Sequence, residues 1–395
     1  MNSISPKIRG ALCVNANPTG CQQNVQYQLE VCHHALRDYQ PPAAAPKTVL
    51  IIGGSAGYGL ASRIVSQVFY NANTFSVIFE KEPAAHKSGS AGWYNNAALH
   101  AVAEKTGKLD ITLNADAFQP ATKQEIIRRL NQQGLKVDLL VYSVAAPRRS
   151  VPQADGSECL YQSVIKPIGK NFTGKTFDIN KGELQNFSVP AASAEEIAHT
   201  VQVMGGEDWQ IWVNELFTAD MLADNFQTVA FSYLGGDVTR AIYHDGTLGR
   251  AKEDLELCCE NINHLLTAGN PRGQLHPPAK VAVLKAIVTQ SSAAIPSLSV
   301  YISALYRVMK QQGTHEDCIA QIIRLFTTGL YPAGALTCNM DKAYRLRLDE
   351  FELAVATQAE VKLLVQNIQP GDIEGVVDFK SFKQDFLQLF GFAWS

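Results

Sequence analysis

A tyrosine and a lysine in the middle of the chain are residue types that can support proton and hydride chemistry. Tyr243 lies in "IYHDGTLGRAK", and Lys252 follows it nine positions later. A phenol with a pKa near ~10 is a weak acid by itself, but an ammonium group nearby stabilises the phenolate and moves its pKa towards neutrality. Taken alone, these two residues leave a structural role and a catalytic role equally open.

Helix geometry restricts where this tyrosine and lysine can meet. Nine residues of an ideal α-helix make about two and a half turns, which places the two side chains on opposite faces. Asp245 and Gly246 lie between them, and aspartate is a good N-cap while glycine interrupts helices. We therefore predict a helix that begins near Thr247, with Tyr243 in the loop before it and Lys252 in its second turn, so that both can approach one ligand.

A glycine-rich turn near residue 55 is typical of a dinucleotide-binding site. In "VLIIGGSAGYGLASRI", an aliphatic run ends at Gly53, and Gly57 and Gly59 open a segment with helical spacing. Glycines permit a tight turn and let a pyrophosphate approach the helix N-terminus, where unpaired N–H groups favour anions. The spacing G-x-x-x-G-x-G differs from the common G-x-G-x-x-G, and a tight turn without a ligand is the alternative interpretation.

Polar residues follow the next strands that the pattern predicts. Glu80 ends the second strand, in "VIFEKEP", about 20 residues after the glycines, where a carboxylate can bind both ribose hydroxyls of adenosine. Its charge repels a 2'-phosphate and favours NADH over NADPH, although Lys81 beside it weakens that repulsion. Asp116 closes the third strand, and Val144 and Ala145 follow the fourth. All three positions can border the adenosine, but Asp116 is equally compatible with a helix cap or a turn.

Short aliphatic runs alternate with helical segments from residue 46 onward. This alternation predicts an α/β fold of Rossmann type with a doubly wound parallel sheet. Residues 147–190, rich in Gly, Pro, Asn and Asp, predict an inserted hairpin region. We expect one domain over 1–395, with an N-terminal segment 1–45, a core 46–313 that contains this insertion, and a mostly helical C-terminal part 314–395. The expected strands are 48–52, 74–80, 109–116, 137–143, 227–233 and 280–288, and the expected helices include 93–107, 121–134, 207–222 and 299–313.

Composition excludes several classes of protein. The chain has 395 residues, of which 46% are hydrophobic and 18% charged, enough to form a large buried core. A net charge of -3 without a long basic run argues against a nucleic-acid partner. No apolar stretch of ~18 residues and no secretory signal are visible, so we expect a cytoplasmic protein without a membrane segment. The eight cysteines lack C-x-x-C spacing and the nine histidines lack H-E-x-x-H, so we expect no metal site.

Motifs along nearly the whole chain resemble one family of reductases. The chain is similar to the FabV-type trans-2-enoyl-CoA and enoyl-acyl-carrier-protein reductases, which are relatives of the short-chain dehydrogenases. Two departures are visible, Val144 where leucine is usual and Ser90 where threonine is usual, and both conserve shape. The similar segments, in chain order, include "PKIRG", "NPTGC", "GYGLASRI", "GWYNNAA", "VYSVAAPRR", "KPIGK", "VMGGEDWQ", "FSYLG", "LKAIVTQSSAAIP", "LYRVMK", "GTHEDCIAQ" and "FLQLFGF".

The resemblance implies a reaction and a set of site residues. It implies a monomer that reduces the C2=C3 double bond of trans-2-enoyl thioesters with NADH, with acyl carrier protein or coenzyme A as the carrier. This is the final step of the fatty acid elongation cycle. Tyr243 matches the active-site tyrosine, Lys252 the lysine of the Tyr-x8-Lys motif, and Tyr233 the tyrosine assigned to substrate binding. The implied NAD contacts are Gly53, Gly54, Ser55, Ala56, Gly57, Tyr58, Phe79, Glu80, Asp116, Ala117, Val144, Ala145, Lys252, Ile287, Val288 and Thr289.

Two other functions remain open from the sequence. A carbonyl reductase on the same scaffold would act on 3-ketoacyl thioesters and ignore enoyl thioesters, and a non-enzymatic NAD sensor would bind NADH without turnover. The apolar run 291–306 can form one wall of an acyl slot or be an ordinary buried helix, with Pro296 kinking or starting that helix.

Overall fold

An eight-stranded sheet forms the centre of the protein in the computed structural model, which describes residues 4–37, 39–153, 155–268 and 277–394. The strand order is β13-β14-β12-β11-β6-β3-β4-β5, and every neighbouring pair is parallel except β13 with β14. The predicted doubly wound α/β fold is therefore confirmed. The strands are β3 (Thr48–Ile52), β4 (Asn73–Ile78), β5 (Asp110–Asn114), β6 (Val137–Tyr142), β11 (Leu222–Ser232), β12 (Ala279–Val283), β13 (Asn339–Met340) and β14 (Leu346–Arg347).

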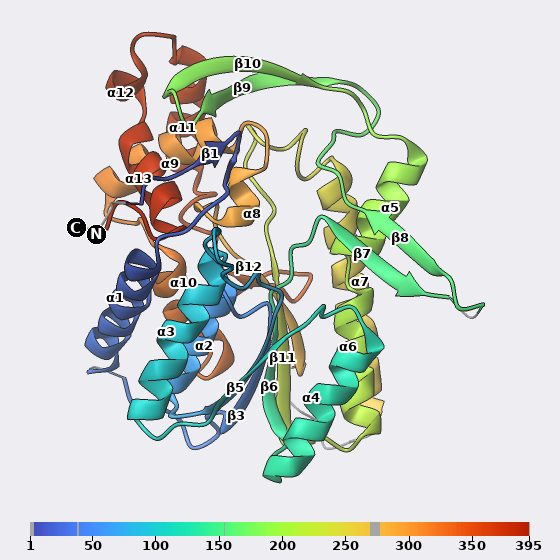
Figure 1. Cartoon of the computed structure of the whole chain (residues 1–395). Coiled ribbons are helices and arrows are strands. Elements are labelled where there is room, and N and C mark those ends of the chain that lie inside the picture. The colour runs from blue at the N-terminus through green and yellow to red at the C-terminus, as the bar shows by residue number, and fades with distance from the viewer. Residues whose placement is uncertain (1–3, 38, 154, 269–276, 395) are drawn as a thin grey trace.

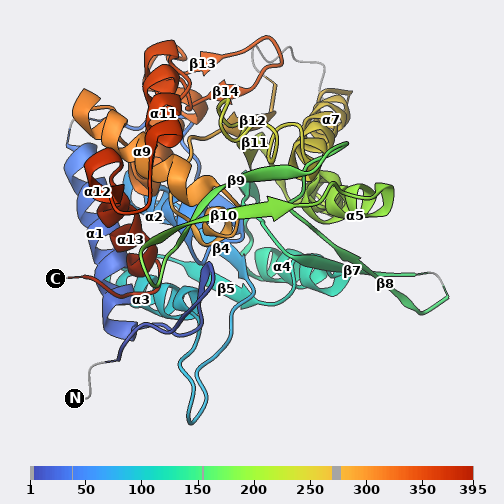
Figure 2. The same ribbon diagram turned by 90° about the horizontal axis from the view of Figure 1, so that it is seen from above.

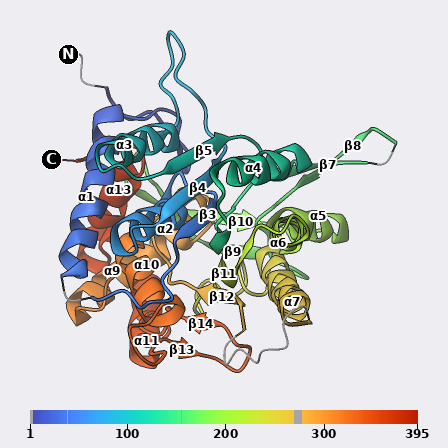
Figure 3. The same cartoon turned by 90° about the horizontal axis from the view of Figure 1, so that it is seen from below.

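Helices cover both faces of this sheet, so its central strands are largely buried. Every residue of β3 and of β12 is buried, as expected for parallel strands between two helical layers. Figures 1 and 3 show α2 and α3 with α1 and α10 on one side of the sheet, and α4, α6 and α7 on the other. These helices are α1 (Pro18–Leu36), α2 (Gly57–Phe69), α3 (Ala91–Lys105), α4 (Pro120–Gln133), α6 (Glu207–Thr218), α7 (Thr247–Ala268) and α10 (Cys318–Arg324), which continues into the π-helix η1 (Leu325–Leu330).

A third group of elements lies beyond the carboxyl ends of the strands. The β9–β10 hairpin arches over α8 and α9, and the C-terminal helices pack beside α9 (Figures 1 and 2). The β1–β2 hairpin lies near the same group. These elements are β1 (Ile8–Arg9), β2 (Leu12–Cys13), β7 (Arg148–Pro152), β8 (Glu158–Gln162), β9 (Phe172–Asp178), β10 (Glu183–Val189), α5 (Ala194–Met204), α8 (Gln290–Ala293), α9 (Leu298–Gln312), α11 (Val355–Asn367), α12 (Ile373–Val376) and α13 (Phe379–Gln388).

Several boundaries differ from the predicted ones for physical reasons. The insertion holds two hairpins, β7–β8 and β9–β10, rather than one. The helix predicted to reach residue 222 ends at Thr218, and Asp220 has a φ of 55°, a left-handed conformation that stops a helix. The strand predicted to reach residue 288 ends at Val283, because the N–H groups of Lys285 and Ala286 are bound by side chains and not by a neighbouring strand.

The two ends of the chain pack against each other. The Asn17 N–H donates to the Phe390 carbonyl at 2.9 Å, and a Cβ on Gly20 would overlap the Gly391 carbonyl oxygen. This backbone contact fixes the start of α1 beside the segment that follows α13. Among the described residues, no helix is both long enough and apolar enough to cross a membrane.

Candidate active site

The predicted site residues follow the carboxyl ends of six neighbouring strands. Along the sheet, the predicted site residue that follows each strand is Ile287 after β12, Tyr233 after β11, Val144 after β6, Gly53 after β3, Glu80 after β4 and Asp116 after β5. The chain runs from β3 outwards through β4 and β5, then returns to β6 on the other side of β3. This reversal is the topological switch point at which open α/β sheets bind their ligands.

The glycine loop connects β3 to α2 as predicted. Gly53 has a φ of 90° and Gly57 a φ of 53°, which side chains adopt only at a cost, and a Cβ on Gly53 would overlap the Ser143 carbonyl oxygen. Ala56, at the N-cap of α2, makes no side-chain cap. The N–H groups of the first turn therefore remain available to an anion such as a pyrophosphate.

A substitution at this turn tests its role. We expect Gly53→Ala to lower the free energy of unfolding by about 2 kcal/mol or more, because it adds a clash to an unfavourable φ, and to abolish NADH binding. Gly134→Ala is the control, because Gly134 has a φ of 63° but open space around it. Calorimetry should show lost NADH binding for the first variant only. Equal NADH affinities in the two variants would contradict the assignment of this loop.

Glu80 is held in place by two serine hydroxyls. The Ser55 hydroxyl donates to its Oε1 at 2.6 Å, and the Ser90 hydroxyl donates to its Oε2. A Cβ on Gly92, in the first turn of α3, would also overlap this carboxylate. Phe79 beside it is 77% exposed. The carboxylate is thus oriented towards the glycine loop before any ligand binds.

The remaining predicted cofactor residues have mixed environments. The Asp116 carboxylate accepts a hydrogen bond from the Phe118 N–H at 2.9 Å, so Asp116 stabilises a turn, as its position in the sequence allows. The Tyr58 hydroxyl donates to the Lys285 carbonyl at 3.2 Å, and its side chain therefore faces the segment after β12. Thr289 N-caps α8, and its methyl group lies 3.7 Å from where a Gly57 Cβ would stand. Of the others, Ala117 and Val144 are half-buried, Ala145 is exposed, and Ile287 and Val288 are buried.

The tyrosine and the lysine lie where the helix argument places them. Helix α7 begins at Thr247, and Tyr243 belongs to the turns before it, where its carbonyl accepts the N–H groups of Gly246 and Gly249. The Lys252 ammonium donates to the carbonyl of Phe231 in β11 at 3.2 Å. Burial lowers the pKa of Lys252 to about 8, and the nearby Glu256 opposes this shift.

The predicted effect of Lys252 on the pKa of Tyr243 is wrong. Burial raises the pKa of Tyr243 instead of moving it towards neutrality, because an ionised phenol would lose its hydration. In the described part of the chain, the Tyr243 hydroxyl has no hydrogen-bond partner, burial is the one cause that shifts its pKa, and the residue is 6% exposed. Tyr243 is therefore a neutral phenol whose hydroxyl is free to donate to a ligand.

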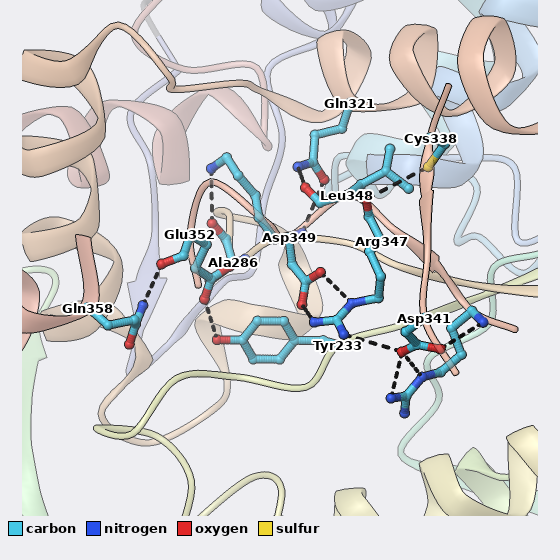
Figure 4. Close-up of polar contacts among 12 residues, drawn as sticks. Tyr233, Ala286, Gln321, Cys338, Asp341, Arg347, Leu348, Asp349, Glu352 and Gln358 are labelled. Atoms are coloured by element: carbon cyan, nitrogen blue, oxygen red, sulfur yellow. Dashed lines mark hydrogen bonds and ion pairs between the residues drawn. The ribbon is translucent and has the colours of Figure 1, made fainter. Parts of the chain in front are cut away.

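Tyr233 is hydrogen-bonded to Glu352, a residue that the sequence did not indicate. Its ring stands edge-on to that of Tyr243, with 4.7 Å between the centroids, and its hydroxyl donates to Glu352 Oε1 at 3.0 Å. Glu352 is fully buried between β14 and α11 (Figure 4). It lies 119 residues from Tyr233, and nothing in "LDEFELAV" distinguishes its carboxylate from its charged neighbours. Only the fold brings the two together.

The apolar run 291–306 is interrupted. Pro296 lies two residues before the first residue of α9, Leu298, so it precedes the start of that helix and does not kink it. Every residue from 298 to 306 is buried, and α9 packs in the same cluster as α13. Helix α9 is therefore an ordinary buried helix. An acyl slot would have to be formed by residues 291–297, which precede α9.

The topology, the glycine loop and the oriented carboxylate together define a Rossmann-type dinucleotide-binding oxidoreductase. Family profiles narrow this class. The profile described as the trans-2-enoyl-CoA reductase catalytic region matches residues 87–331, and that of the NAD(P)H binding domain of trans-2-enoyl-CoA reductase matches residues 3–85. The chain belongs to the family of trans-2-enoyl-CoA and enoyl-acyl-carrier-protein reductases.

Relatives and solved structures agree over almost the full length. The chain is 46% identical to the enoyl-[acyl-carrier-protein] reductase [NADH] of Saccharophagus degradans, covering 99% of this chain and 95% of the relative. It is 41% identical to the trans-2-enoyl-CoA reductase of Euglena gracilis, covering 99% of this chain and 69% of the relative. The Clostridium trans-2-enoyl-CoA reductase in complex with NADH superposes with a TM-score of 0.92 at 37% identity, over 99% and 95% of the two chains.

A third profile, described as an enoyl reductase FAD binding domain, matches residues 340–395. The described part of this segment does not fit a flavin dinucleotide. It holds no glycine turn between a strand and a helix like that at 53–57, and Gly391 packs against the backbone of Asn17. Phe379, Phe382 and Phe386 of α13 fill the core beside α9. We assign no chemical step to a flavin.

Proposed function

We propose that this protein reduces the C2=C3 double bond of trans-2-enoyl thioesters with NADH. The observation that carries the proposal is the neutral, unbonded Tyr243 hydroxyl beside a cofactor cradle, in a chain similar to enoyl reductases over 99% of its length. The NADH in the name of the Saccharophagus relative and the NADH in the Clostridium complex support the choice of cofactor.

The reaction needs a hydrogen-bond donor at one oxygen. Bound NADH supplies the hydride to C3, and negative charge then develops on the thioester oxygen before C2 is protonated. Stabilisation of such an oxyanion by a positioned donor is a large term in catalysis. We assign that hydrogen bond, and the proton for C2, to Tyr243. Lys252 orients the nicotinamide ribose, and Tyr233 positions the substrate.

The cofactor contacts follow from the row of strand ends. The α2 N-terminus with its glycine loop binds the pyrophosphate, and Glu80 accepts hydrogen bonds from the adenosine ribose. The segments after β5, β6 and β12 complete the cofactor site. We propose contacts at residues 53–58, Phe79, Glu80, Asp116, Ala117, Val144, Ala145, Lys252 and 287–289, as the resemblance implied.

The Glu80 assignment predicts a change of cofactor preference. In Glu80→Gln, the ribose loses a charged acceptor and a 2'-phosphate is no longer repelled. We expect kcat/KM to fall about tenfold with NADH and to rise about tenfold with NADPH. Glu82→Gln is the matched control, because it removes the same charge from an exposed position two residues away. Unchanged preference in Glu80→Gln, measured with both cofactors, would remove Glu80 from the site.

The identity of the acyl carrier and the organisation of the chain are further parts of the proposal. One relative is named for the acyl carrier protein and another for coenzyme A, and we propose that thioesters of both are substrates. We also propose a single domain, because β14, from the C-terminal part, pairs with β12 of the core. A cytoplasmic monomer is proposed as the sequence and the resemblance implied. Kinetics with crotonyl-CoA and crotonyl-acyl-carrier protein, each with NADH and NADPH, test the carrier and cofactor together.

A further inference from the structure

The buried carboxylate of Glu352 binds three groups from separate parts of the chain. Its Oε1 accepts the hydroxyls of Tyr233 at 3.0 Å and of Tyr301, in α9, at 2.7 Å. Its Oε2 accepts the Ala286 N–H at 2.6 Å (Figure 4). Ala286 immediately precedes the proposed cofactor segment 287–289. One side chain therefore joins the proposed substrate tyrosine to the backbone at the cofactor site.

The directions of these hydrogen bonds are determined by the chemistry of the groups. Burial raises the pKa values of Tyr233 and Tyr301 well above the ordinary phenol value, so both phenols keep their protons and donate them. Burial also raises the pKa of Glu352, while the bonds from Tyr301, Ala286 and Tyr233 and the charge of Lys285 oppose that shift. A buried carboxylate with several donors is the acceptor in each contact.

This direction limits what Tyr233 can do for the substrate. A phenol has one hydrogen, and Tyr233 donates it to Glu352, so only the lone pairs of the Tyr233 oxygen remain for other partners. The thioester oxygen is also an acceptor and cannot bond to those lone pairs. The Tyr243 hydroxyl has no partner in the described chain, and it remains the donor for the developing oxyanion.

We propose that Glu352 is a positioning residue for enoyl thioester reduction: it binds the Tyr233 hydroxyl, holds that ring against Tyr243, and leaves the oxyanion to the Tyr243 hydroxyl alone. This inference rests on the proposed function. The hydrogen bond that its Oε2 accepts from the Ala286 N–H fixes the start of the cofactor segment 287–289. Glu352 thereby links the C-terminal part of the chain to both halves of the site without touching either ligand.

A double-mutant cycle separates this role from a general contribution to folding. Wild type, Glu352→Gln, Tyr233→Phe and the double variant are compared in crotonyl-CoA reduction at saturating NADH. The glutamine keeps the shape of the side chain but cannot accept hydrogen bonds at both of its ends. We expect Glu352→Gln to lower kcat/KM for crotonyl-CoA about tenfold in wild type, and less than twofold when Tyr233 is already phenylalanine.

Two further measurements accompany the double-mutant cycle. The KM for NADH should rise to the same extent in both backgrounds, because the Ala286 contact does not depend on Tyr233. Asp385→Asn is the matched control: the Asp385 carboxylate accepts the hydroxyl of another α9 tyrosine, Tyr306, at 2.8 Å. It should change the unfolding midpoint but leave kcat/KM for crotonyl-CoA at the wild-type value.

The possible outcomes have distinct meanings. Equal losses of kcat/KM in the two backgrounds, or no loss in Glu352→Gln, would overturn the positioning role while the proposed function stands. No crotonyl-CoA reduction by the wild-type protein would overturn the proposed function, and the positioning role with it. If Glu352→Gln does not fold, Glu352→Asp replaces it in the same cycle, because it keeps the charge and withdraws the oxygens from the phenols. The same criterion then applies.

Discussion

Tyr243→Phe is expected to reduce kcat for crotonyl-CoA with NADH by about 10²- to 10³-fold, the usual loss when one donor to an oxyanion is removed. The physical reason is that the Tyr243 hydroxyl is the neutral, unbonded donor at the site. NADH affinity should change little, because the ring remains and no cofactor contact is assigned to it. Steady-state kinetics and NADH titration measure the two quantities separately.

Tyr331→Phe is the matched control for this substitution. Tyr331 is 3% exposed, and its hydroxyl has no hydrogen-bond partner among the described residues, like that of Tyr243. It lies towards the amino-terminal side of the sheet, since burial and then the charge of Asp138, at the start of β6, raise the pKa of Tyr331. Removal of its hydroxyl should leave kcat unchanged. Near-normal turnover by Tyr243→Phe would show that the assignment of the oxyanion donor is wrong.

Lys252→Met is expected to lower kcat/KM for NADH by about 10²-fold and to remove its dependence on pH near 8. In the wild type, burial lowers the pKa of Lys252 to about 8, so the ammonium that binds the ribose is lost as the pH rises through that value. We therefore expect wild-type kcat/KM to fall above pH about 8, and the Met variant to be uniformly slow across the same range.

The stability linkage of this lysine has the opposite sign. Between pH about 8 and 10.5 the unfolded chain carries the Lys252 proton and the folded chain does not, so folding becomes more favourable as the pH rises. Loss of activity in this range therefore cannot be attributed to unfolding at Lys252. Lys280→Met is the control: burial also lowers the pKa of Lys280 to about 8, but this residue is the second of β12, at the amino-terminal end of that strand. An unaltered pH profile in Lys252→Met would contradict the assignment.

The sequence was sufficient for the local features of the site. The Asp245-Gly246 pair placed the start of α7 at Thr247 and Tyr243 outside the helix, because capping and glycine preferences act over a few residues. The glycine loop and Glu80 followed from the alternation of buried strands with helices. These features depend on neighbours in the chain, which a pattern can report.

Features that depend on distant contacts were not predictable. The strand expected to reach residue 288 stops at Val283, because Gln321 and Glu352 bind the next backbone N–H groups from other elements. The predicted lowering of the Tyr243 pKa is wrong because burial raises this pKa, and the Lys252 ammonium donates to the Phe231 carbonyl instead. The two-residue strands β13 and β14 are too short to produce an alternating pattern, and only their pairing identifies them.

The position of transferred deuterium tests the proposed function most directly. The purified protein is given crotonyl-CoA and NADH that carries deuterium at both C4 positions of the nicotinamide, and the product is examined by mass spectrometry and NMR. Conjugate reduction predicts butyryl-CoA with one deuterium at C3 and a solvent proton at C2. A protein that leaves crotonyl-CoA unchanged, but transfers deuterium to the carbonyl carbon of acetoacetyl-CoA, would be a carbonyl reductase, and that result would contradict the proposal.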